Sequence, residues 1–339
     1  MTWTFQPAAD ALESSLSEWD ALNRARTNHI LLDSGLVAPL LRYFGNKEIL
    51  LGINADPKHA GMALLTPLGV GRWETFQPSQ APIGLIVFDY IDQSGEGLQE
   101  LTRSLPRHAL QLSVLQQDPD YSSFPLQNIE GQLERVDYIQ TARITLNGTF
   151  EEYWKARGTN LRHNLARRRR RVSEKGYALE VVEIRSSAEV PAAIREFGVL
   201  ESRGWKGREG TAISEDNAQG QFYRDVFEHF CDRKEAVIYQ LKFNGKIAAS
   251  DLCVFRGGMM VVLKTAYDEE LNDFSPAFLM REEILPRLWA DDRIQVVEFY
   301  GRVMEWHTRW SEEIRTLYHV NCMRHAWIEP LKKLAGRLT

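Results

Sequence analysis

The fold is decided by residues 236–268, which read AVIYQLKFNGKIAASDLCVFRGGMMVVLKTAYD. Three runs rich in β-branched and aromatic residues are separated by two short turns, Asn244–Gly245 and Gly257–Gly258. Asn-Gly and Gly-Gly pairs readily adopt the left-handed backbone that a two-residue hairpin turn requires. The stretch therefore predicts three antiparallel strands over residues 236–243, 246–255 and 259–268.

Helical and strand patterns alternate on both sides of these strands. Residues 149–175, with an interruption near Gly158, and residues 187–204, 219–234 and 276–290 follow helical spacing, and residues 177–184 and 294–300 read as strands. The first half repeats the mixture, with helical patterns at 18–45 and 98–105 and strand patterns at 49–54, 61–67, 70–76, 83–89, 109–116 and 137–146. The pattern predicts a layered α/β fold in two parts, residues 1–147 and 148–339.

Composition excludes several classes of protein. With 339 residues, of which 44% are hydrophobic, the chain can build real cores and is not a disordered or fibrous protein. The net charge of −5 gives no general attraction to nucleic acid or anionic membranes. Residues 1–145 hold 10 Lys and Arg against 17 Asp and Glu, whereas the rest of the chain holds 31 against 29. An anion-handling site is therefore expected in the second half.

No targeting, membrane or metal motif is visible. The first residues, MTWTFQPAADALESS, are acidic and lack the basic and apolar regions of a signal peptide. No window approaches the roughly 18 apolar residues of a membrane-spanning helix. The three cysteines have no zinc-type spacing, so no metal site is expected. We expect a cytoplasmic protein that is not inserted in a membrane.

The start of the helix at 276–290 is a candidate anion site. Ser275 and Pro276 are typical of the N-cap and the first helical position, and they predict unpaired N–H groups near residues 277–279. Such groups can hold a pyrophosphate, although an ordinary helix cap has the same sequence pattern.

Three stretches carry a resemblance to a known family. They are ESRGWKGREGTAI (201–213), KTAYDEELNDFSPAFLM (264–280) and GRVMEWHTRWSEEIRTLYHV (301–320). Together they resemble the GNAT-superfamily acyltransferases of the cellulose-biosynthesis-associated and FemAB-like group. The resemblance implies two tandem GNAT-like folds, each a mixed, mostly antiparallel sheet flanked by helices. The second fold would be catalytic, and the first would form one wall of the acceptor cleft.

The resemblance also implies a reaction. An acyl group would pass from acetyl-CoA or another acyl-CoA to an amine or hydroxyl of a polysaccharide or cell-envelope precursor, by direct attack in a ternary complex and without a metal. The acceptor would be a small molecule, a glycan or a peptide. The expected CoA-binding residues lie on the last strand of residues 236–268 and on the helix start after it: Lys264, Thr265, Phe274, Ser275, Ala277, Phe278 and Leu279.

The sequence departs from the family at Ala277, where the family usually has glycine, and it lacks the usual glycine-rich signature. A methyl group at this position narrows the approach of a phosphate to the backbone. Two alternatives therefore stay open. One is a FemAB-like peptidyl transferase that uses aminoacyl-tRNA, and the other is an inactive GNAT-like binding module.

Acid–base candidates follow from the need to deprotonate the acceptor. Glu298, an acid among apolar strand residues, is the first candidate base, and Asp251 is the second. Tyr267 could protonate the leaving thiolate, as the resemblance implies, and His307 could be a base or a substrate contact. We expect substrate binding by Trp205, Lys206, Arg208 and Trp306. A purely structural role is the alternative for each of these residues.

The five arginines at 167–171 have three possible roles. If the run is helical, Leu161, Leu165 and Val172 form a narrow apolar stripe, and the arginines surround much of the helix. No aromatic residue lies within residues 161–175 to stack on bases, so binding of duplex nucleic acid is not expected. A solvated structural helix and a contact to an anionic donor, including tRNA in the alternative function, remain open.

Overall fold

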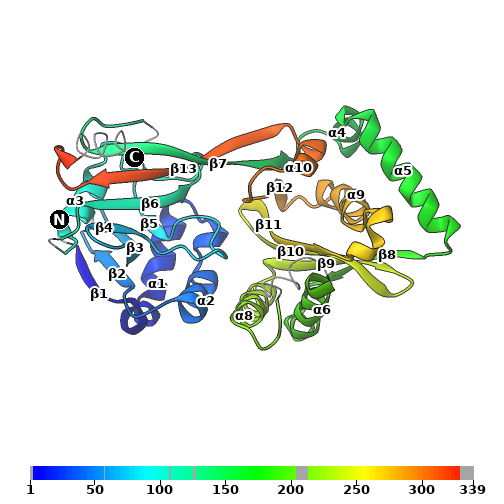
Figure 1. Cartoon of the computed structure of the whole chain (residues 1–339), viewed down its shortest axis with the longest axis horizontal. Coiled ribbons are helices and arrows are strands. Elements are labelled where there is room, and N and C mark those ends of the chain that lie inside the picture. Colours follow the sequence, from blue (N-terminus) through cyan, green and yellow to red (C-terminus); the bar gives the residue numbers. More distant parts are fainter. Residues whose placement is uncertain (1–2, 57, 107, 125–126, 204–212, 329–339) are drawn as a thin grey trace. The chain divides into compact units, whose positions relative to one another are not determined.

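The computed structural model describes residues 3–56, 58–106, 108–124, 127–203 and 213–328 (Figure 1). The chain divides into two compact units. Unit 1 comprises residues 1–140 and 315–339, and unit 2 comprises residues 141–314. The predicted fold class is confirmed, because each unit contains a mixed, mostly antiparallel sheet flanked by helices.

Unit 2 is built on the predicted strands β9 (Ala236–Phe243), β10 (Lys246–Arg256) and β11 (Gly258–Tyr267). The four turn residues between them all have φ between 49° and 86°, as the two-residue turns require. The strand order of the sheet is β7-β12-β11-β10-β9-β8. The added strands are β7 (Leu133–Thr145), which enters unit 2 at Thr141, β8 (Leu179–Ile184) and β12 (Ile294–Glu298).

Helices cover both faces of this sheet (Figure 1). On one face lies α9 (Pro276–Trp289), with α4 (Phe150–Ala156) and α5 (Thr159–Glu174) packed beside it. On the other face lie α6 (Val190–Arg203) and α8 (Ala218–Asp232). The remaining helical segments are η2 (Ser187–Glu189), η3 (Glu269–Phe274) and α10 (Glu305–Trp310).

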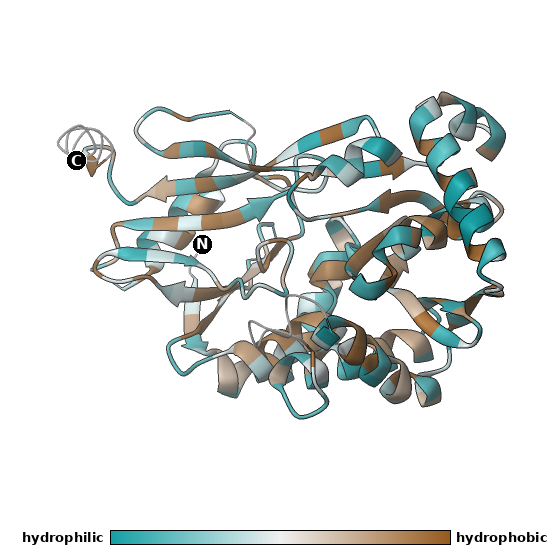
Figure 2. Cartoon of the chain, turned by 45° about the vertical axis from the view of Figure 1, so that its right-hand side comes forward, coloured by the Kyte–Doolittle hydropathy of each residue, from teal (hydrophilic) through white to brown (hydrophobic). Residues whose placement is uncertain are grey.

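The arginine-rich segment forms α5, and the break before it falls at residues 157–158, close to the prediction. Leu161, Leu165 and Val172 are buried, so the predicted apolar stripe is confirmed. Figure 2 shows that most of the remaining surface of α5 is hydrophilic. Arg169 joins α5 to α9 through ion pairs of 2.6 and 2.7 Å with Glu282 and Glu283. At least one of the five arginines therefore has a structural role.

Unit 1 has the strand order β1-β2-β3-β4-β6-β13-β7, with β5 paired to β3. Its strands are β1 (Thr4–Pro7), β2 (Leu50–Asn54), β3 (Gly61–Pro67), β4 (Arg72–Thr75), β5 (Ile86–Phe88), β6 (Gln111–Gln117) and β13 (Glu313–Met323). Its helical segments are α1 (Ala8–Arg26), η1 (Ile30–Leu32), α2 (Ser34–Phe44) and α3 (Glu96–Ser104). The first helix begins at Ala8, ten residues before the predicted start, without a capping side chain to mark it.

The bounds of the two units differ from the expected division, which placed the boundary between residues 147 and 148. The residues from Arg315 onward belong to unit 1, because β13 pairs with β6 there. Tyr318, Val320 and Cys322 are buried in the same core cluster as Leu112 and Val114. The end of the chain thus completes the sheet of the first unit, an arrangement that depends on contacts about 200 residues apart.

Candidate functional site

A gap between two parallel strands marks the candidate site in unit 2. β11 and β12 are paired only from Gly258–Ile294 to Val261–Glu298, where β12 ends. The β10–β11 register shifts by one residue at Leu263, because Leu252 pairs with Lys264 but Cys253 pairs with Val262. From Val262 to Tyr267, β11 is paired with β10 but, among the described strands, with no strand on the β12 side, so every second N–H and C=O group points toward that edge. We call this strand edge without a partner strand the unit 2 notch.

A buried polar cluster lies on the α9 face of the sheet beside this notch. The Thr265 hydroxyl donates a hydrogen bond of 2.5 Å to Asp251, and Arg281 of α9 donates one of 3.2 Å to the Thr265 oxygen. Arg281 also forms an ion pair of 3.6 Å with Asp251. Burial raises the pKa of Asp251, while the positive charge of Arg281 and the hydrogen bond from Thr265 oppose the rise. Asp251 thus holds Arg281, which favours a positioning role over that of a base.

Aromatic rings enclose the same arginine. The Arg281 guanidinium lies 4.4 Å from the centre of the Trp306 ring and 5.3 Å from that of Phe299. His307 stacks on Trp306 with the ring centres 3.5 Å apart. Cation–π contacts are stronger where the cation is desolvated, so these rings stabilise the buried charge. The structure therefore brings Asp251, Trp306 and His307 into one cluster, through an arginine that the sequence analysis did not identify.

The hydrogen bond of His307 defines its role. Its Nδ1 accepts a hydrogen bond of 2.9 Å from the Met304 N–H, which leaves the proton of the neutral ring on Nε2. Burial, and next the charge of Arg281, lower the pKa of His307 to about 4. At neutral pH the ring is uncharged and is a hydrogen-bond donor through Nε2. This arrangement favours substrate positioning by His307 over general base catalysis.

Glu298, the last residue of β12, lies where the notch begins. Its neighbour Val297 belongs to the core beneath α9, so strand alternation directs Glu298 to the opposite face. The Glu298 side chain is 0% exposed and forms an ion pair of 3.6 Å with Arg143 of β7. Arg143 also lies 3.6 Å from Glu313. The first candidate base is thus a fully buried carboxylate at the end of β12 that shares one arginine with Glu313.

Lys264 and Tyr267, three residues apart on β11, point to different faces of the sheet. The Lys264 amine forms an ion pair of 2.9 Å with Glu201 of α6, and its charge lies 5.3 Å from the centre of the Tyr223 ring. Glu201 also accepts a hydrogen bond from the Ile213 N–H. Lys264 therefore links β11 to α6, which favours a structural role over phosphate binding. Tyr267 is 40% exposed at the end of β11 and is accessible to a ligand.

The start of α9 offers fewer free donors than the sequence predicted. Ser275 is at the N-cap with a left-handed backbone, and its side chain does not cap the helix. The N–H groups of Phe278 and Leu279 both donate to the Ser275 carbonyl, at 3.0 and 3.2 Å. The expectation of unpaired N–H groups at residues 278 and 279 is therefore wrong. Because Pro276 has no N–H, Ala277 is the remaining donor of this turn.

The side chains of the expected CoA-binding helix start pack mostly inward. Phe274 lies 5.7 Å from Tyr177 and 6.1 Å from Phe243, measured between ring centres. Leu279 is 0% exposed in the core, and Phe278 and Ala277 pack against the same core cluster. The buried side chain of Leu279 therefore cannot contact a cofactor, whereas Phe274, Ser275, Ala277 and Phe278 are partly exposed. Trp205, Lys206 and Arg208, which were predicted to bind substrate, lie outside the described residues.

One signal in the sequence could have identified Arg281. Ala277, Arg281, Ile284 and Leu288 follow each other at helical spacing, so Arg281 interrupts an apolar stripe of α9. A cation at such a position requires a buried partner. No comparable signal links Arg143 to Glu298, since these residues meet only through the pairing of β7 with β12.

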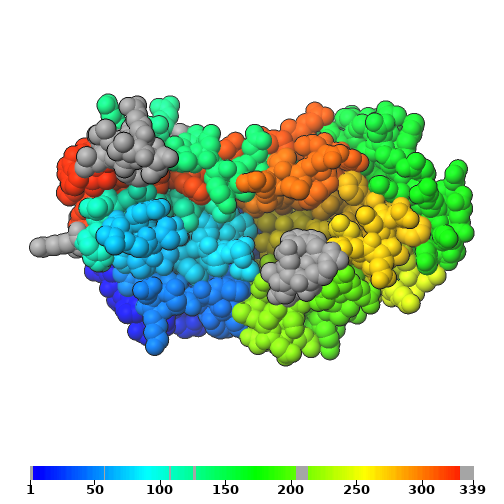
Figure 3. Space-filling view, in the orientation of Figure 1, coloured from blue at the N-terminus to red at the C-terminus, as the bar shows by residue number. Residues whose placement is uncertain are grey.

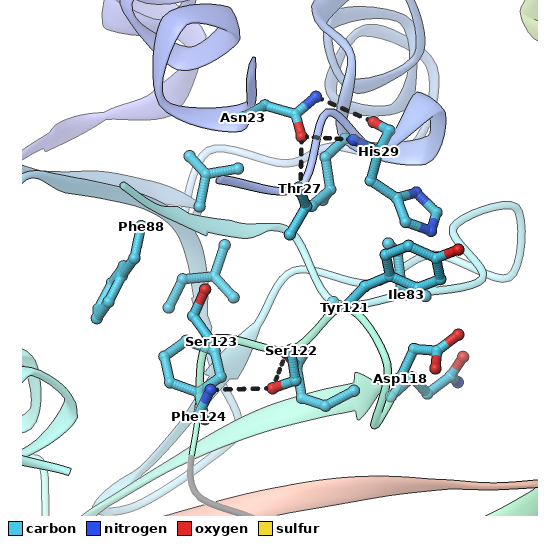
Figure 4. Close-up of a pocket in the computed structure, with 16 residues that line it drawn as sticks. Asn23, Thr27, His29, Ile83, Phe88, Asp118, Tyr121, Ser122, Ser123 and Phe124 are labelled. Atoms are coloured by element: carbon cyan, nitrogen blue, oxygen red, sulfur yellow. Dashed lines mark hydrogen bonds between the residues drawn. The ribbon is translucent and has the colours of Figure 1, made fainter. Parts of the chain in front are cut away.

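Unit 1 contains a small cavity of about 30 Å³, close to the volume available to a water molecule (Figure 4). Asn23 donates to the His29 carbonyl and accepts from the His29 N–H and the Thr27 hydroxyl. Tyr121 contacts His29 edge to face, at 5.0 Å between ring centres. Hydrogen bonds within the protein thus satisfy several polar groups around this cavity, which is too small for an acyl donor.

Among the described residues, no group of three His, Cys, Asp or Glu side chains could hold a metal ion. A separate search of the same residues finds no helix that is both long and apolar enough to cross a membrane.

Comparisons with known proteins agree with this geometry. The family model described as "Acetyltransferase (GNAT) domain" matches residues 159–308, which lie within unit 2. FemX has 11% sequence identity and a TM-score of 0.60, over 94% of this chain and 98% of that chain. A C-terminal DUF2156 domain from Agrobacterium fabrum has 12% identity and a TM-score of 0.55, over 96% of both chains. L-PGS from Bacillus licheniformis has 13% identity and a TM-score of 0.51, over 91% of both chains.

No curated protein matches the chain. The family match and the solved structures support a transferase with a GNAT-like acyltransferase fold. At these sequence identities the structural similarities establish the fold alone.

Proposed function

We propose that this protein transfers an acyl group from an acyl-CoA to an amine or hydroxyl of a cell-envelope or polysaccharide precursor, and that unit 2 carries the reaction. The observation that best supports the proposal is the notch between β11 and β12, within the residues that match the acetyltransferase model. A gap of this kind exposes strand N–H groups at a fixed position, and fixed donors can stabilise a developing negative charge.

Direct attack of the acceptor on the acyl carbonyl places a negative charge on the carbonyl oxygen. A backbone N–H of β11 between Leu263 and Tyr267, on the edge that faces the opening, stabilises this oxyanion. Because β10 holds the other edge of β11 in register, the donor is already oriented before the reaction begins. No covalent intermediate with the protein is required.

One carboxylate and one phenol hydroxyl transfer the protons of the reaction. Glu298, at the mouth of the notch, takes the proton that the attacking amine or hydroxyl loses. Tyr267, exposed at the far end of β11, returns a proton to the leaving thiolate. Asp251 and Arg281 position Trp306 and His307, and the Nε2–H of His307 binds an acceptor oxygen.

The start of α9 fits the pyrophosphate of CoA only in part. A diphosphate needs several clustered N–H groups or cations. At this helix start the N–H groups of Phe278 and Leu279 already bond to Ser275, and Ala277 carries a Cβ where glycine would allow closer approach. If acyl-CoA is the donor, its thioester end is bound more closely than its pyrophosphate.

The same observation favours a second candidate, in which the donor is an aminoacyl-tRNA, as in FemAB-like enzymes. Such a donor has no pyrophosphate to bind at α9. Its backbone phosphates could contact the exposed arginines of α5, such as Arg170 and Arg171. This candidate uses the same notch and the same acid–base residues.

Calorimetric titration separates the two donors. We expect micromolar binding of acetyl-CoA, followed by acyl transfer to amine or sugar acceptors that is lost in Glu298→Gln. Binding of charged tRNA alone, with a steep dependence on salt, would instead establish the second candidate. Binding of neither donor would contradict both and would leave an inactive GNAT-like module.

A further inference from the structure

A pocket of about 470 Å³ lies apart from the notch, where α4, α5 and α10 meet. In the space-filling view, the green residues of α4 and α5 lie beside the orange residues around α10 (Figure 3). The pocket is lined by Arg157, Gly158, Asn160, Leu161, Asn164, Thr308, Arg309 and Glu312. This lining combines two guanidinium groups and two amides, which can donate hydrogen bonds, with the Glu312 carboxylate and with the Thr308 hydroxyl, which donates to the Glu305 carbonyl at 2.8 Å.

Arg157 is fixed in the wall of this pocket. Its side chain is only 11% exposed, donates a hydrogen bond of 3.0 Å to the Trp310 carbonyl and lies 4.9 Å from the centre of the Tyr153 ring. Its Nε–H is buried and has no hydrogen-bond partner among the described residues. The protein thus holds a positive charge at the pocket with donors to spare.

The carboxylates nearby neutralise this charge only weakly. Glu312 is 84% exposed and lies 3.8 Å from Arg157, and Glu305 is 81% exposed and lies 2.6 Å from Arg309. Solvent strongly screens ion pairs between such exposed groups. Both glutamates can turn toward water when an anion enters.

The first turn of α5 adds to the positive potential. Gly158 is the N-cap, has no side chain to cap the helix and is followed by no acidic residue in the first turn. Asn160 and Asn164, one turn apart, line the pocket from this end of the 16-residue helix. The N–H groups of Leu161 and Arg162 donate to the Gly158 carbonyl, at 3.0 and 3.4 Å, so the helix dipole rather than a cluster of free donors favours an anion at this position.

Further arginines lie in the second half of α5, beyond the pocket lining. Arg167 donates a hydrogen bond of 3.2 Å to Asn164 at the edge of the pocket. Burial lowers the pKa of Arg168, and the charges of Arg167, Arg309 and Arg171 lower it further. Of the arginines that act on Arg168, only Arg309 lines the pocket, so the arginines of α5 add to its positive potential from a distance.

We propose that this pocket binds the phosphate group of a small phosphoester. A carboxylate needs one guanidinium fork, whereas two arginines, two amides and the positive end of a helix dipole suit the several oxygens and higher charge of a phosphate. The pocket volume leaves room for a small group attached to the phosphate. The proposal goes beyond the acyl-transfer function and does not depend on the identity of the acyl donor.

The test is calorimetric titration of the full chain with inorganic phosphate and with pyrophosphate at low salt. The informative variant is Asn160→Asp, because a carboxylate in the first turn stabilises the helix while repelling an anion. We expect phosphate binding to weaken about tenfold in this variant without a loss of thermal stability. Arg309→Gln should weaken phosphate binding by a similar factor.

Arg170→Gln is the matched control. Arg170 is also on α5, but it is 74% exposed, pairs with Glu174 and does not line the pocket. Phosphate binding that survives in this variant and falls in Asn160→Asp supports the pocket. Absence of phosphate and pyrophosphate binding at millimolar concentration, or equal losses in both variants, overturns it.

Single-stranded RNA and phosphatidylglycerol vesicles provide a further comparison. If they bind, lose affinity in Arg170→Gln and keep it in Asn160→Asp, while phosphate does not bind, the pocket is overturned. The arginines of α5 would then form a surface for a polymeric or membrane anion. Failure of the protein to bind acetyl-CoA would contradict the acyl-CoA function but would not affect the test of the phosphate pocket.

Discussion

The two units each contain a parallel strand pair, and the two pairs end differently. In unit 1, β4 and β6 are paired from Arg72–Gln111 to Glu74–Ser113. Beyond this point the chain itself fills the gap. The Gly84 N–H bonds to the Gln116 carbonyl, the Leu115 N–H bonds to the Thr75 hydroxyl, and β5 pairs with β3. In unit 2, β12 leaves β11 after Val261, and no other strand in the described part of the chain pairs with the six following residues of β11 on that side.

The sheets of the two units have similar strand pairings, but the gaps beyond their parallel pairs favour different roles. The backbone groups in the gap of unit 1 are satisfied by the protein, which favours stability. Among the described strands, none pairs with the corresponding edge of β11 in unit 2, and a buried cluster around Arg281 lies beside it. Strand order alone does not distinguish the two units, because the distinction depends on what occupies the gap.

The largest expected effect concerns Glu298. Replacement by glutamine keeps the shape of the side chain but removes the base, so kcat/KM for acyl transfer should fall about 100-fold to 10,000-fold. Steady-state kinetics and a circular dichroism spectrum measure activity and folding. Glu74→Gln is the control, since Glu74 lies on β4 beside the filled gap of unit 1. Equal losses in both variants would contradict the assignment of catalysis to unit 2.

The second effect concerns the buried pair of Asp251 and Arg281. Asp251→Asn leaves the arginine without its counter-charge, so the free energy of unfolding should fall by about 3–5 kcal/mol. Urea denaturation measures this loss, and adding Arg281→Met should restore most of it. Glu174→Gln removes an exposed pair and should change stability by about 0.5 kcal/mol or less. A stable Asp251→Asn variant would show that the cluster does not support the notch.

The contrast with unit 1 can be tested at Gly84. A Cβ at this position would lie 2.3 Å from the Leu115 carbonyl oxygen and 3.1 Å from the Thr75 hydroxyl. Gly84→Ala should therefore lower the free energy of unfolding by about 1–3 kcal/mol without lowering the kcat of the folded protein. Denaturation and kinetics on the same preparation measure both quantities. A loss of kcat with unchanged stability would assign a catalytic function to the filled gap.

The last effect is a pH dependence from His307, which is small for each step in pH. Its pKa in the folded state is about 4, below the ordinary value of 6.5, so the unfolded chain binds more protons between these values. Stability is therefore fully present above pH 6.5 and falls on acidification toward pH 4, with a slope of up to about 1.4 kcal/mol per pH unit. His307→Asn should remove this part of the slope, as denaturation at several pH values can measure. An NMR titration with a pKa near 6.5 would contradict the buried, neutral ring.

These elements also show how far the sequence could predict the structure. Local signals were sufficient for β9, β10 and β11, because Asn244–Gly245 and Gly257–Gly258 define their turns within a few residues. The early start of α1 was missed, because no capping side chain precedes Ala8. The place of β13 was also missed, because it depends on pairing with a distant strand.

The candidate site was predicted only in part, for the same physical reason. Asp251, Trp306 and His307 were chosen separately, and Arg281 joins them through contacts across a strand, a helix and a loop. Lys264 was expected to bind CoA, but it forms an ion pair with Glu201 of α6. A charged side chain that is a candidate ligand contact in the sequence can form an ion pair with a residue that only the fold brings close.

Hydrogen–deuterium exchange with and without acyl donor tests the central claim most directly. If unit 2 binds the donor in its notch, saturating acetyl-CoA or aminoacyl-tRNA should slow exchange in residues 262–267 and leave residues 111–117 of unit 1 unchanged. Protection of residues 111–117 instead, or no protection of residues 262–267 by either donor, would contradict the account.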